Sequence, residues 1–599
     1  MIPKGKRKFI FTLVAACVIA AMLLPACQAE EAGEVKEVEK EEPAQPDIKN
    51  PGTFIYATIG PPDSLDPAYA YDTSSGEIIQ AVYETLLFWK GESTTEFDPI
   101  LATEWTVSED GKTYRFKIRK GVEFHNGNTM TPEDVEYSFE RGMVQDYGAG
   151  PQWMLFEPLF GTDTHTTRTD DGLIPLDEIK SKVEVDGDWV QFNLVSAYEP
   201  FLQILSNSWG SILDMEWCIE NGDWDGTQAS YEALNDPPSG GSPIQSVMNG
   251  TGPFELERWD EGVETVLVRN DNYWRAPAKL ERVVIKVVEE WTTRRLMLEA
   301  GDADHVDVPR AHIDELEGVE GLTIWKDLPT LNNDALFFQF DISEESTFTG
   351  SGKLDGAGIP NDFFTDVDVR KGIAYAFNWE VYLKDALKNE AQQTGSAIVE
   401  GLSYYDANAP RYTWDLAKAE EHLKKAWGGE VWEKGFTFTI AYNAGNVTRK
   451  IGCEILQENL FNINEKFTVL IQVMQWPTLL RGMYAALMPM FQIGWMADYP
   501  DAHNFIFPFQ SSAGTFSGWQ NYKNAEVDAL IAEGIAGTTA AAREATYRKL
   551  DQLYIDDVPS FILAQPLGRR YFRSWVKGFY HNPVLPGNYG NLYDLSKEY

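Results

Sequence analysis

The order of apolar and polar residues predicts strands that alternate with helices along most of the chain. Alternating or continuous apolar runs typical of strands lie at 53–60, 104–109, 112–119, 254–271, 279–290, 335–342, 436–443, 467–475, 488–495 and 560–579. Apolar residues at the 3.6-residue period of amphipathic helices lie at 75–88, 131–143, 292–301, 368–387, 415–427 and 447–461. Because helices of ten or more residues separate the strands, the pattern indicates a layered α/β architecture.

Local turn and capping signals sharpen two of these elements. The pair Asp110-Gly111 between two alternating runs predicts a β-hairpin. Thr131 followed by Pro132 and by Asp134 predicts the first turn of a helix. Between 146 and 246 the periodicity weakens and Gly, Asp, Pro and Trp accumulate, which predicts a loop-rich α+β subdomain.

Length and charge narrow the classes of function. A chain of 599 residues is too long for one hydrophobic core, so several domains are expected. The 92 acidic residues outnumber the 50 basic ones, which gives a net charge of −42. Nucleic acids and anionic lipid surfaces attract clustered Lys and Arg, so we expect neither as a partner of the folded body.

The N-terminus has the pattern of an export signal. The basic stretch Lys4–Lys8 precedes an apolar stretch, Phe9–Leu24, that is too short for a confident membrane span. Leu24-Pro25-Ala26-Cys27 resembles a bacterial lipobox, although Pro25 departs from it. We therefore expect residues 1–26 to be a lipoprotein signal peptide and Cys27 to be lipidated. Cys17 is a rival cleavage site with a shorter apolar core.

The residues after Cys27 predict a surface-anchored protein without structural metal or disulfides. Residues 27–51 are charged and interrupted by Pro, as expected for a flexible tether. The remaining cysteines, Cys218 and Cys453, lie far apart and form no C-x-x-C pair. The sequence thus predicts an extracytoplasmic body held at a cell membrane by its lipid, on the periplasmic or the outer face.

The sequence contains none of the common catalytic motifs, and one segment has the spacing of a metal-binding loop. We find no G-x-S-x-G, H-E-x-x-H, P-loop or G-x-G-x-x-G motif, so we expect no enzyme and no cofactor. Asn221–Glu232 has the spacing of a calcium-binding EF-hand loop. Its first position is Asn and its eighth is Gln228, which favours an ordinary surface turn and no metal.

A lone carboxylate in an apolar and aromatic run marks a candidate site. Asp498 lies in the sequence GWMADYPDA, Gly494–Ala502. An unpaired charge in such surroundings is costly to desolvate. Either Asp498 faces water and caps the turn at Pro500, or it forms half of an ion pair. If the other half arrives with a ligand, this motif is part of a binding site.

Several segments together resemble one protein family. The sequences WTVSEDGKTYRFKIRKGVEFHNG and TPEDVEYSF, at 105–127 and 131–139, resemble the signature region of family 5 extracellular solute-binding proteins, which include the peptide-binding proteins of ABC importers. Further segments fit in order: SLDP at 64–67, GTGPF at 250–254, NDNYW at 270–274, AGDAD at 300–304, DVRKGIAYAFN at 368–378 and GWMADYP at 494–500. The resemblance covers most of residues 52–599.

The resemblance implies a two-lobed type II periplasmic-binding-protein fold with an extra subdomain in its first lobe. The implied core of lobe I comprises residues 52–85, 247–308 and 560–599, and the extra subdomain comprises 86–246. Lobe II spans 309–559, so the chain crosses between lobes twice. Such a protein binds its solute in the cleft between the lobes. We expect a monomer that delivers the solute to the transmembrane subunits of an ABC permease.

The resemblance also implies ligand contacts. In similar peptide binders the first and third residues of this motif pair with peptide backbone, roles that fall here to Gly494 and Met496. The motif's aspartate, Asp498, would hold the peptide's terminal ammonium. The remaining expected ligand-binding residues are Trp495, Trp476 and, more loosely, Thr73. Both tryptophans have an alternative reading as plain core.

Two positions depart from the family pattern and leave the ligand open. Met483 and Gln492 replace arginines that would face the far end of a peptide, so capture of a terminal carboxylate would need Arg481 or water instead. The 19 tryptophans would also suit sugar rings, which makes an oligosaccharide or another solute an alternative ligand. An extracytoplasmic hydrolase is a remote alternative that no motif supports.

Overall fold

The computed structural model describes residues 48–169, 171–537, 539–587 and 589–599. The expected signal peptide, the lipidation site Cys27 and nearly all of the expected tether lie outside these residues. Within them, no helix combines the length and the apolar composition needed to cross a membrane.

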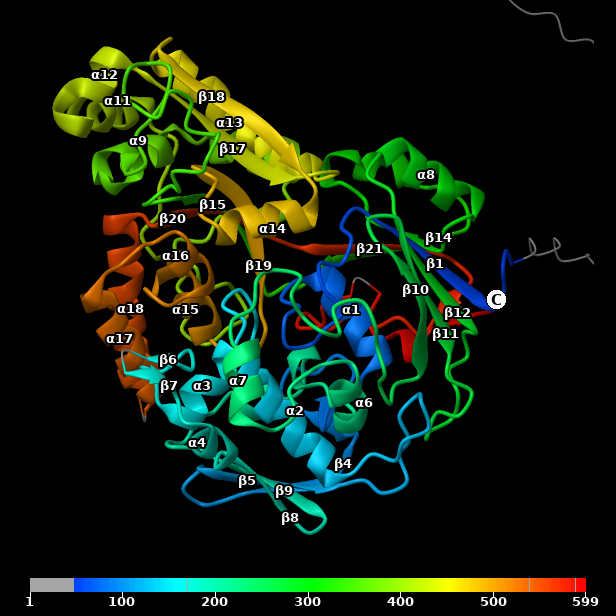
Figure 1. Ribbon diagram of the computed structural model, residues 1–599. Helices are drawn as coiled ribbons and strands as arrows, with labels where there is room; N and C mark the ends of the chain where they lie inside the picture. The colour runs from blue at the N-terminus through cyan, green and yellow to red at the C-terminus, as the bar shows by residue number, and fades with distance from the viewer. Residues whose placement is uncertain (1–47, 170, 538, 588) are drawn as a thin grey trace, which may run out of the picture. The chain divides into compact units, whose positions relative to one another are not determined.

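Two mixed sheets carry the body of the fold (Figure 1). The first sheet has, in spatial order, β10 (Phe254–Asp260), β11 (Glu264–Arg269), β12 (Arg282–Val287), β1 (Thr53–Thr58), β13 (His305–Val306), β21 (Gly568–Arg573) and β14 (Leu322–Leu328). The second sheet has β16 (Ala391–Gln392), β20 (Ser560–Pro566), β15 (Asn332–Phe338), β19 (Met490–Met496), β17 (Phe436–Asn443) and β18 (Phe467–Met474). Both contain strands from distant parts of the sequence, so neither can form from one local segment.

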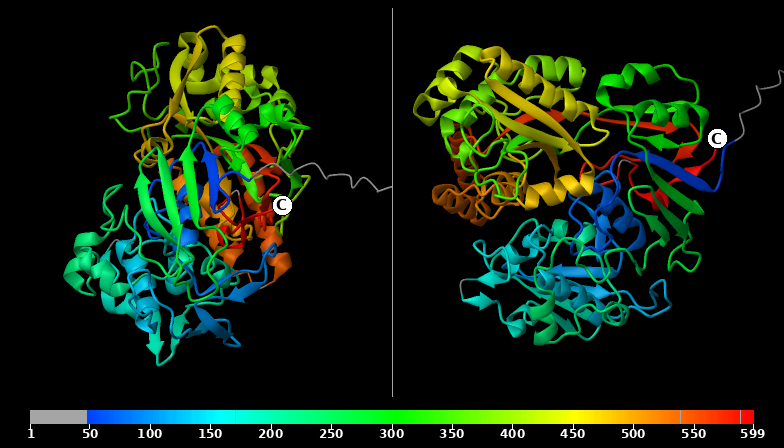
Figure 2. Two further views of the ribbon diagram at one scale, coloured as in Figure 1. Left: turned by 90° about the vertical axis from the view of Figure 1, so that its right-hand side faces the viewer. Right: turned by 45° about the horizontal axis from the view of Figure 1, so that its top comes forward.

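A third, antiparallel sheet and the longer helices complete the fold. The third sheet has β4 (Ala102–Val107), β5 (Thr113–Ile118), β9 (Trp189–Asn193) and β8 (Val183–Asp186). The helices of eight or more residues are α1 (Thr73–Val82), α2 (Pro132–Gln145), α3 (Trp153–Phe160), α8 (Trp291–Ala300), α9 (Val367–Ala376), α11 (Leu416–Lys425), α13 (Val447–Ile463), α14 (Trp476–Tyr484), α15 (His503–Gln510), α17 (Ala525–Ala536) and α18 (Ala540–Asp557). In both views of Figure 2, α13 packs beside β17 and β18, whereas the third sheet lies near α2.

The chain passes between the first and second sheets at two adjacent points. Residues 329–331 connect β14 to β15, and Leu567 alone connects β20 to β21. The hydroxyl of Thr330 donates to the carbonyl of Pro566 over 2.5 Å, so the two connections are tied together. The expected limits of lobe II, 309 and 559, do not coincide with these crossings: β14 pairs in the first sheet and β20 in the second. The division into lobes and subdomain remains a prediction.

Most elements expected from the pattern are present, and three expectations were wrong. The helix expected at 75–88 ends at Val82, and its last residues belong to the strand β2 (Leu87–Trp89). The hairpin around Asp110-Gly111 is β4 paired with β5. Asp134 accepts a hydrogen bond from the backbone of Thr131 and completes the predicted start of α2. The region 146–246 is more ordered than expected, because β8 and β9 extend the third sheet. The single helix expected at 368–387 is interrupted after α9, where Phe377 is extended.

A buried charge network joins the segment after β1 to α2. Arg141 donates through Nη1 and Nη2 to the two carboxylate oxygens of Asp66, over 2.9 and 2.6 Å. Its Nε donates to Asp223 over 2.7 Å, and all three side chains are at most 1% exposed. Each charge is compensated only by the others, so losing one partner leaves the rest buried without compensation.

We therefore expect Arg141→Met to lower the free energy of unfolding by about 3–5 kcal/mol, since two carboxylates lose their cation. Urea-induced unfolding followed by fluorescence measures the change. Lys90→Met is the control, because Lys90 pairs with Glu96 at the exposed surface and should cost no more than about 1 kcal/mol. Equal losses in the two variants would contradict the structural role of the buried network.

Candidate functional site

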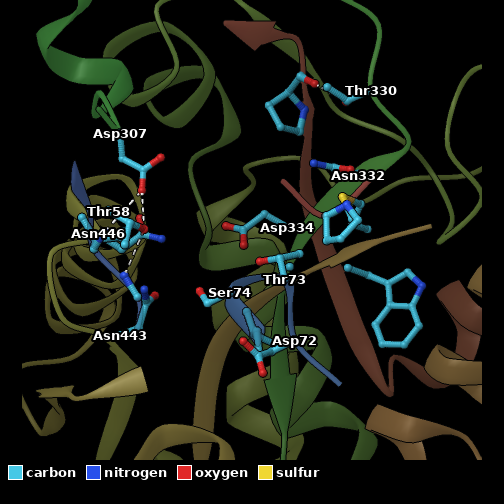
Figure 3. Close-up of a pocket in the computed structure, with 18 of the residues that line it drawn as sticks. Thr58, Asp72, Thr73, Ser74, Asp307, Thr330, Asn332, Asp334, Asn443 and Asn446 are labelled. Atoms are coloured by element: carbon cyan, nitrogen blue, oxygen red, sulfur yellow. Dashed lines mark hydrogen bonds between the residues drawn. The ribbon is translucent and has the colours of Figure 1, made fainter. Parts of the chain in front are cut away.

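A cavity of about 540 Å³ opens between elements of the first and second sheets. Its lining includes the segment before α1, the end of β13, the end of β19 and the second crossing between the sheets. Polar side chains are prominent: Figure 3 shows Asp72, Thr73, Ser74 and Asp334 around the same space. A volume within the range of about 300–1,000 Å³ is typical of pockets that bind small organic molecules.

All six residues expected to bind a ligand line this one cavity: Thr73, Trp476, Gly494, Trp495, Met496 and Asp498. Met483, Gln492 and Arg481 do not. Met483 and Gln492 are at most 1% exposed, and Arg481 pairs with Asp63 over 3.3 Å. Replacement of the missing arginines by Arg481 therefore has no support in this geometry.

Asp498 is a buried carboxylate with neutral partners. Only 8% of the residue is exposed. The hydroxyl of Tyr71 and the side-chain amide of Asn504 each donate to Oδ2 over 2.8 Å. No Lys, Arg or His nitrogen of the described chain lies within 4 Å of the carboxylate. Burial raises its pKa to about 7, although the hydrogen bonds from Asn504 and Tyr71 act in the opposite direction.

The alternative that Asp498 only caps a turn does not fit this arrangement. The turn at Pro500 is capped by Asp501, whose carboxylate accepts from the backbone N–H of His503 over 2.8 Å. The backbone N–H of Asp498 donates to Asn504 instead, and its own carboxylate accepts from no backbone N–H of the described chain. Asp498 therefore presents a carboxylate with spare acceptor capacity beside the cavity.

The strand that leads to Asp498 has one open edge. β19 pairs with β15 along its whole length, from Met490 to Met496. On its other side it pairs with β17 only at Met490 and Phe491. Gly494 and Met496 lie two residues apart, so their backbone groups face the same side of the strand. An extended ligand could form backbone hydrogen bonds along this free stretch, as an added strand.

Gly494 also has a packing role. A Cβ atom at this position would lie 2.6 Å from the carbonyl oxygen of Asn333 on β15. It would also lie 3.3 Å from a guanidinium nitrogen of Arg449 and from a carboxylate oxygen of Asp334. Only glycine leaves space for these three groups.

The two tryptophans differ in their surroundings. Trp495 is 8% exposed and makes edge-to-face contacts with Tyr71 and Phe516, at ring separations of 5.6 and 5.2 Å. The interpretation of Trp495 as a core residue therefore fits, because most of its ring is buried. Trp476 begins α14, is half-buried, and donates from Nε1 to Asp72 over 3.2 Å. Thr73, the first residue of α1, is exposed to the cavity.

Sequence reasoning missed an ion pair in the cavity wall. Nε of Arg449 donates to Asp334 over 3.2 Å, and Gln492 donates to the other carboxylate oxygen over 2.6 Å. Gln492 also donates to the hydroxyl of Tyr382 over 3.2 Å, so it contacts two residues of the cavity lining without belonging to the lining itself. The sequence did contain a signal for this ion pair. Asp334 directly precedes the apolar run ALFF, and a carboxylate beside apolar residues is the same feature that marked Asp498.

Three acidic side chains of the calcium-loop pattern at Asn221–Glu232 have protein partners in this structure. Asp223 is committed to Arg141, and Asp225 accepts from Thr227 and Ser230. Gln228–Leu234 form the helix α7, on which Glu232 accepts from Gln228. Across the described residues, no three His, Cys, Asp or Glu side chains converge in a way that could hold a metal ion.

Comparison with known proteins assigns the chain to a family. Residues 96–517 match the family model of bacterial extracellular solute-binding proteins, family 5. The chain belongs to this family. The resemblance expected from the sequence segments is thereby confirmed.

Family relatives and solved structures cover nearly the whole chain. The probable D,D-dipeptide-binding periplasmic protein DdpA of Escherichia coli is 25% identical over 91% of this chain and 94% of its own length. Heme-binding protein A of Haemophilus influenzae is 24% identical over 99% of both chains. The structure of DppA from Helicobacter pylori with the peptide STSA superposes with a TM-score of 0.73 at 24% identity, over 92% of this chain and 98% of that one. The expected two-lobed type II fold is confirmed by this likeness.

Asp498 should make the stability of this solute-binding protein fall as the pH rises. Its folded pKa, about 7, exceeds the ordinary value of 3.8, so the folded state holds the proton more tightly. This stabilisation is complete below about pH 4 and is lost by about pH 7. Asp498→Asn removes the ionisable group and with it the pH-dependent loss, so the stability of the variant relative to wild type should rise by up to a few kcal/mol between pH 4 and 7. Thermal unfolding across this range tests the prediction, and parallel curves would contradict it.

Gly494→Ala should lower the free energy of unfolding by about 1–3 kcal/mol, because the added methyl group clashes with the backbone of β15. Gly518→Ala is the matched control, since a Cβ there has no neighbour closer than 3.4 Å. Chemical denaturation compares the two. A Gly494→Ala variant as stable as Gly518→Ala would show that the strand has room for a side chain.

Proposed function

We propose that this solute-binding protein captures peptides and delivers them to an ABC permease. The observation that carries the proposal is the buried carboxylate of Asp498, which has neutral partners and lies at the end of a strand with an open edge. A peptide supplies both missing parts: an ammonium group for the carboxylate and an extended backbone for β19. The names of relatives such as DdpA, the dipeptide-binding protein of Escherichia coli and AppA of Bacillus subtilis support this choice.

The proposed contacts follow the geometry of the cavity. The ligand's ammonium group donates to Asp498, most directly to Oδ1, because Oδ2 already accepts from Tyr71 and Asn504. The first residues of the bound peptide run along Gly494 and Met496. Trp476 and Thr73 lie beside the peptide. A charge-assisted hydrogen bond is about twice as strong as a neutral one. Backbone pairing is indifferent to side-chain identity, so a range of peptides would bind.

An oligosaccharide is a second candidate, favoured by one observation. Four tryptophans line the cavity: Trp209, Trp476, Trp495 and Trp519. Aromatic faces suit sugar rings, yet a neutral sugar would leave the carboxylate of Asp498 without a cation. The peptide proposal accounts for this charge, whereas the sugar proposal does not. We propose a receptor without a catalytic step in either case.

The remaining parts of the proposal rest on the sequence. We propose that Cys27 carries a lipid and that residues 27–51 tether a monomeric receptor at the outer side of a cell membrane. The lipobox-like sequence at 24–27 and the charged residues after it support this placement. Held there, the receptor meets external solutes close to its permease.

Asp498→Asn should weaken binding of a free-amine peptide by about tenfold or more, since the ammonium loses its counter-charge. Calorimetry with trialanine and with N-acetyl-trialanine measures the effect. The acetylated peptide has no charged amine, so its weaker binding should change little in the variant. Glu96→Gln, which alters an exposed acid outside the cavity, should leave both affinities unchanged.

Two results would contradict the peptide proposal. Equal affinity of wild type and Asp498→Asn for trialanine would remove the assigned role of Asp498. Binding of cello- or xylo-oligosaccharides, with no response to any peptide, would favour the sugar alternative. Mass spectrometry of small molecules that co-purify with the protein provides an independent check.

A further inference from the structure

Most of the arginines that line the cavity have their guanidinium groups occupied. Five arginines of the described chain belong to the lining. The protein partners are Glu390 for Arg310 and Arg569, Asp334 for Arg449, and the backbone carbonyls of Val288, Glu289 and Asp307 for Arg294. The fifth, Arg570 on β21, has no such set of partners.

The guanidinium of Arg570 keeps most of its donors available. Nη1 donates to the backbone carbonyl of Arg569 over 2.8 Å, and no other hydrogen bond from this side chain to the described chain exists. Nε is fully buried and has no acceptor. A guanidinium carries four N–H donors on its two Nη atoms, so three of these remain for another group. No carboxylate of the described chain lies within 4 Å of it, in contrast to neighbouring Arg569, which pairs with Glu390 and Glu317.

The charges around Arg570 do not cancel it. Burial and the nearby positive charge of Arg310 lower the pKa of Arg570, while Asp307 and Tyr56 act in the opposite direction. Asp307 is not within ion-pair distance, and its carboxylate already accepts from Tyr56, Thr58 and the backbone N–H of Ile59. Arg570 is partly buried, and a partly desolvated cation without a close anion is unfavourable unless a ligand provides one.

We propose that Arg570 binds a carboxylate group of the ligand. This inference rests on the proposed peptide function and deepens it. A carboxylate fits the planar fork of a guanidinium through two parallel hydrogen bonds. The chemistry is shared by a C-terminal carboxylate and by an Asp or Glu side chain, so the ligand class is a peptide with at least one carboxylate.

The placement of Arg570 gives this contact a further consequence. Arg570 lies in the first sheet, whereas Asp498 directly follows a strand of the second. A peptide that carries an ammonium and a carboxylate could therefore satisfy one unpaired charge on each side of the sheet crossing. Contacts on both sides favour the arrangement in which the two sides are close together, which is the requirement for ligand-driven closure.

Two pairs of tetrapeptides with free N-termini test the proposal by calorimetry. The first pair is Ala-Ala-Ala-Ala as the acid and as the C-terminal amide. The second is Ala-Ala-Glu-Ala-amide and Ala-Ala-Gln-Ala-amide. Wild type should bind the carboxylate member of at least one pair about tenfold or more tightly than its partner. The pair that shows this preference identifies the source of the carboxylate.

In Arg570→Gln the preference should fall to within about twofold, while affinity for the amide peptides stays within about threefold of wild type. Arg570→Lys, which keeps the charge and loses the fork, should give an intermediate preference. Arg481→Gln is the matched control, because Arg481 lies outside the cavity lining, and it should keep the wild-type preference. A preference that persists in Arg570→Gln, or is missing in wild type, would overturn the proposal.

Failure of the peptide function itself gives a different result. If no tetrapeptide binds wild type, sodium succinate provides a small dicarboxylate probe. Thermal unfolding in succinate, compared with sodium chloride at equal ionic strength, should show stabilisation of wild type and none of Arg570→Gln. Equal behaviour of the two proteins in succinate would refute the assignment of Arg570 even where the peptide function has failed.

Discussion

The site depends on the cost of burying one carboxylate without a cation. Asp498 accepts hydrogen bonds from Tyr71 and Asn504, which are strong enough to orient it and too weak to replace a positive charge. The hydroxyl of Tyr71 is in turn held by Nε1 of Trp153 over 3.0 Å. Because the pKa of the carboxyl is about 7, it can hold a proton without a ligand and release it when a cation arrives. Because its protein partners are neutral, the carboxylate of Asp498 remains available to pair with a positively charged group of the ligand.

The same contacts link the two sides of the cavity. Tyr71 and Asp72 precede α1, whereas their partners Asp498 and Trp476 belong to the region of the second sheet. Deeper in the protein, Nε2 of His503 on α15 lies 2.8 Å from the carboxylate of Glu157 on α3, and both side chains are at most 1% exposed. Burial raises the pKa of Glu157, but His503, His165 and Tyr198 together outweigh this effect and lower the pKa overall. A ligand must therefore add to an interface that already has polar contacts of its own.

Local patterns predicted the elements well, because each depends on residues close in sequence. The hairpin at Asp110-Gly111 and the helix start at Thr131 required only turn and capping chemistry. The strands β8 and β9 were missed, because their periodicity is weak and their place in the sheet depends on pairing of β9 with β5 and of β8 with β9. The crossings at 329–331 and Leu567 could not be predicted either. They are defined by pairing between strands more than 200 residues apart. The pattern of apolar residues does not indicate which strands pair with each other.

The candidate site shows the same limit at the level of single side chains. Asp498 stood out because its own neighbours are apolar, but its partner Tyr71 is 427 residues away. Arg569 and Arg570 are indistinguishable in sequence. In a strand, adjacent side chains leave opposite faces, and here Glu390 and Glu317 pair with Arg569 but not with Arg570. Arg569 is held by ion pairs, whereas Arg570 keeps most of its N–H donors available. This difference arises only when the two residues are placed in the first sheet as part of β21.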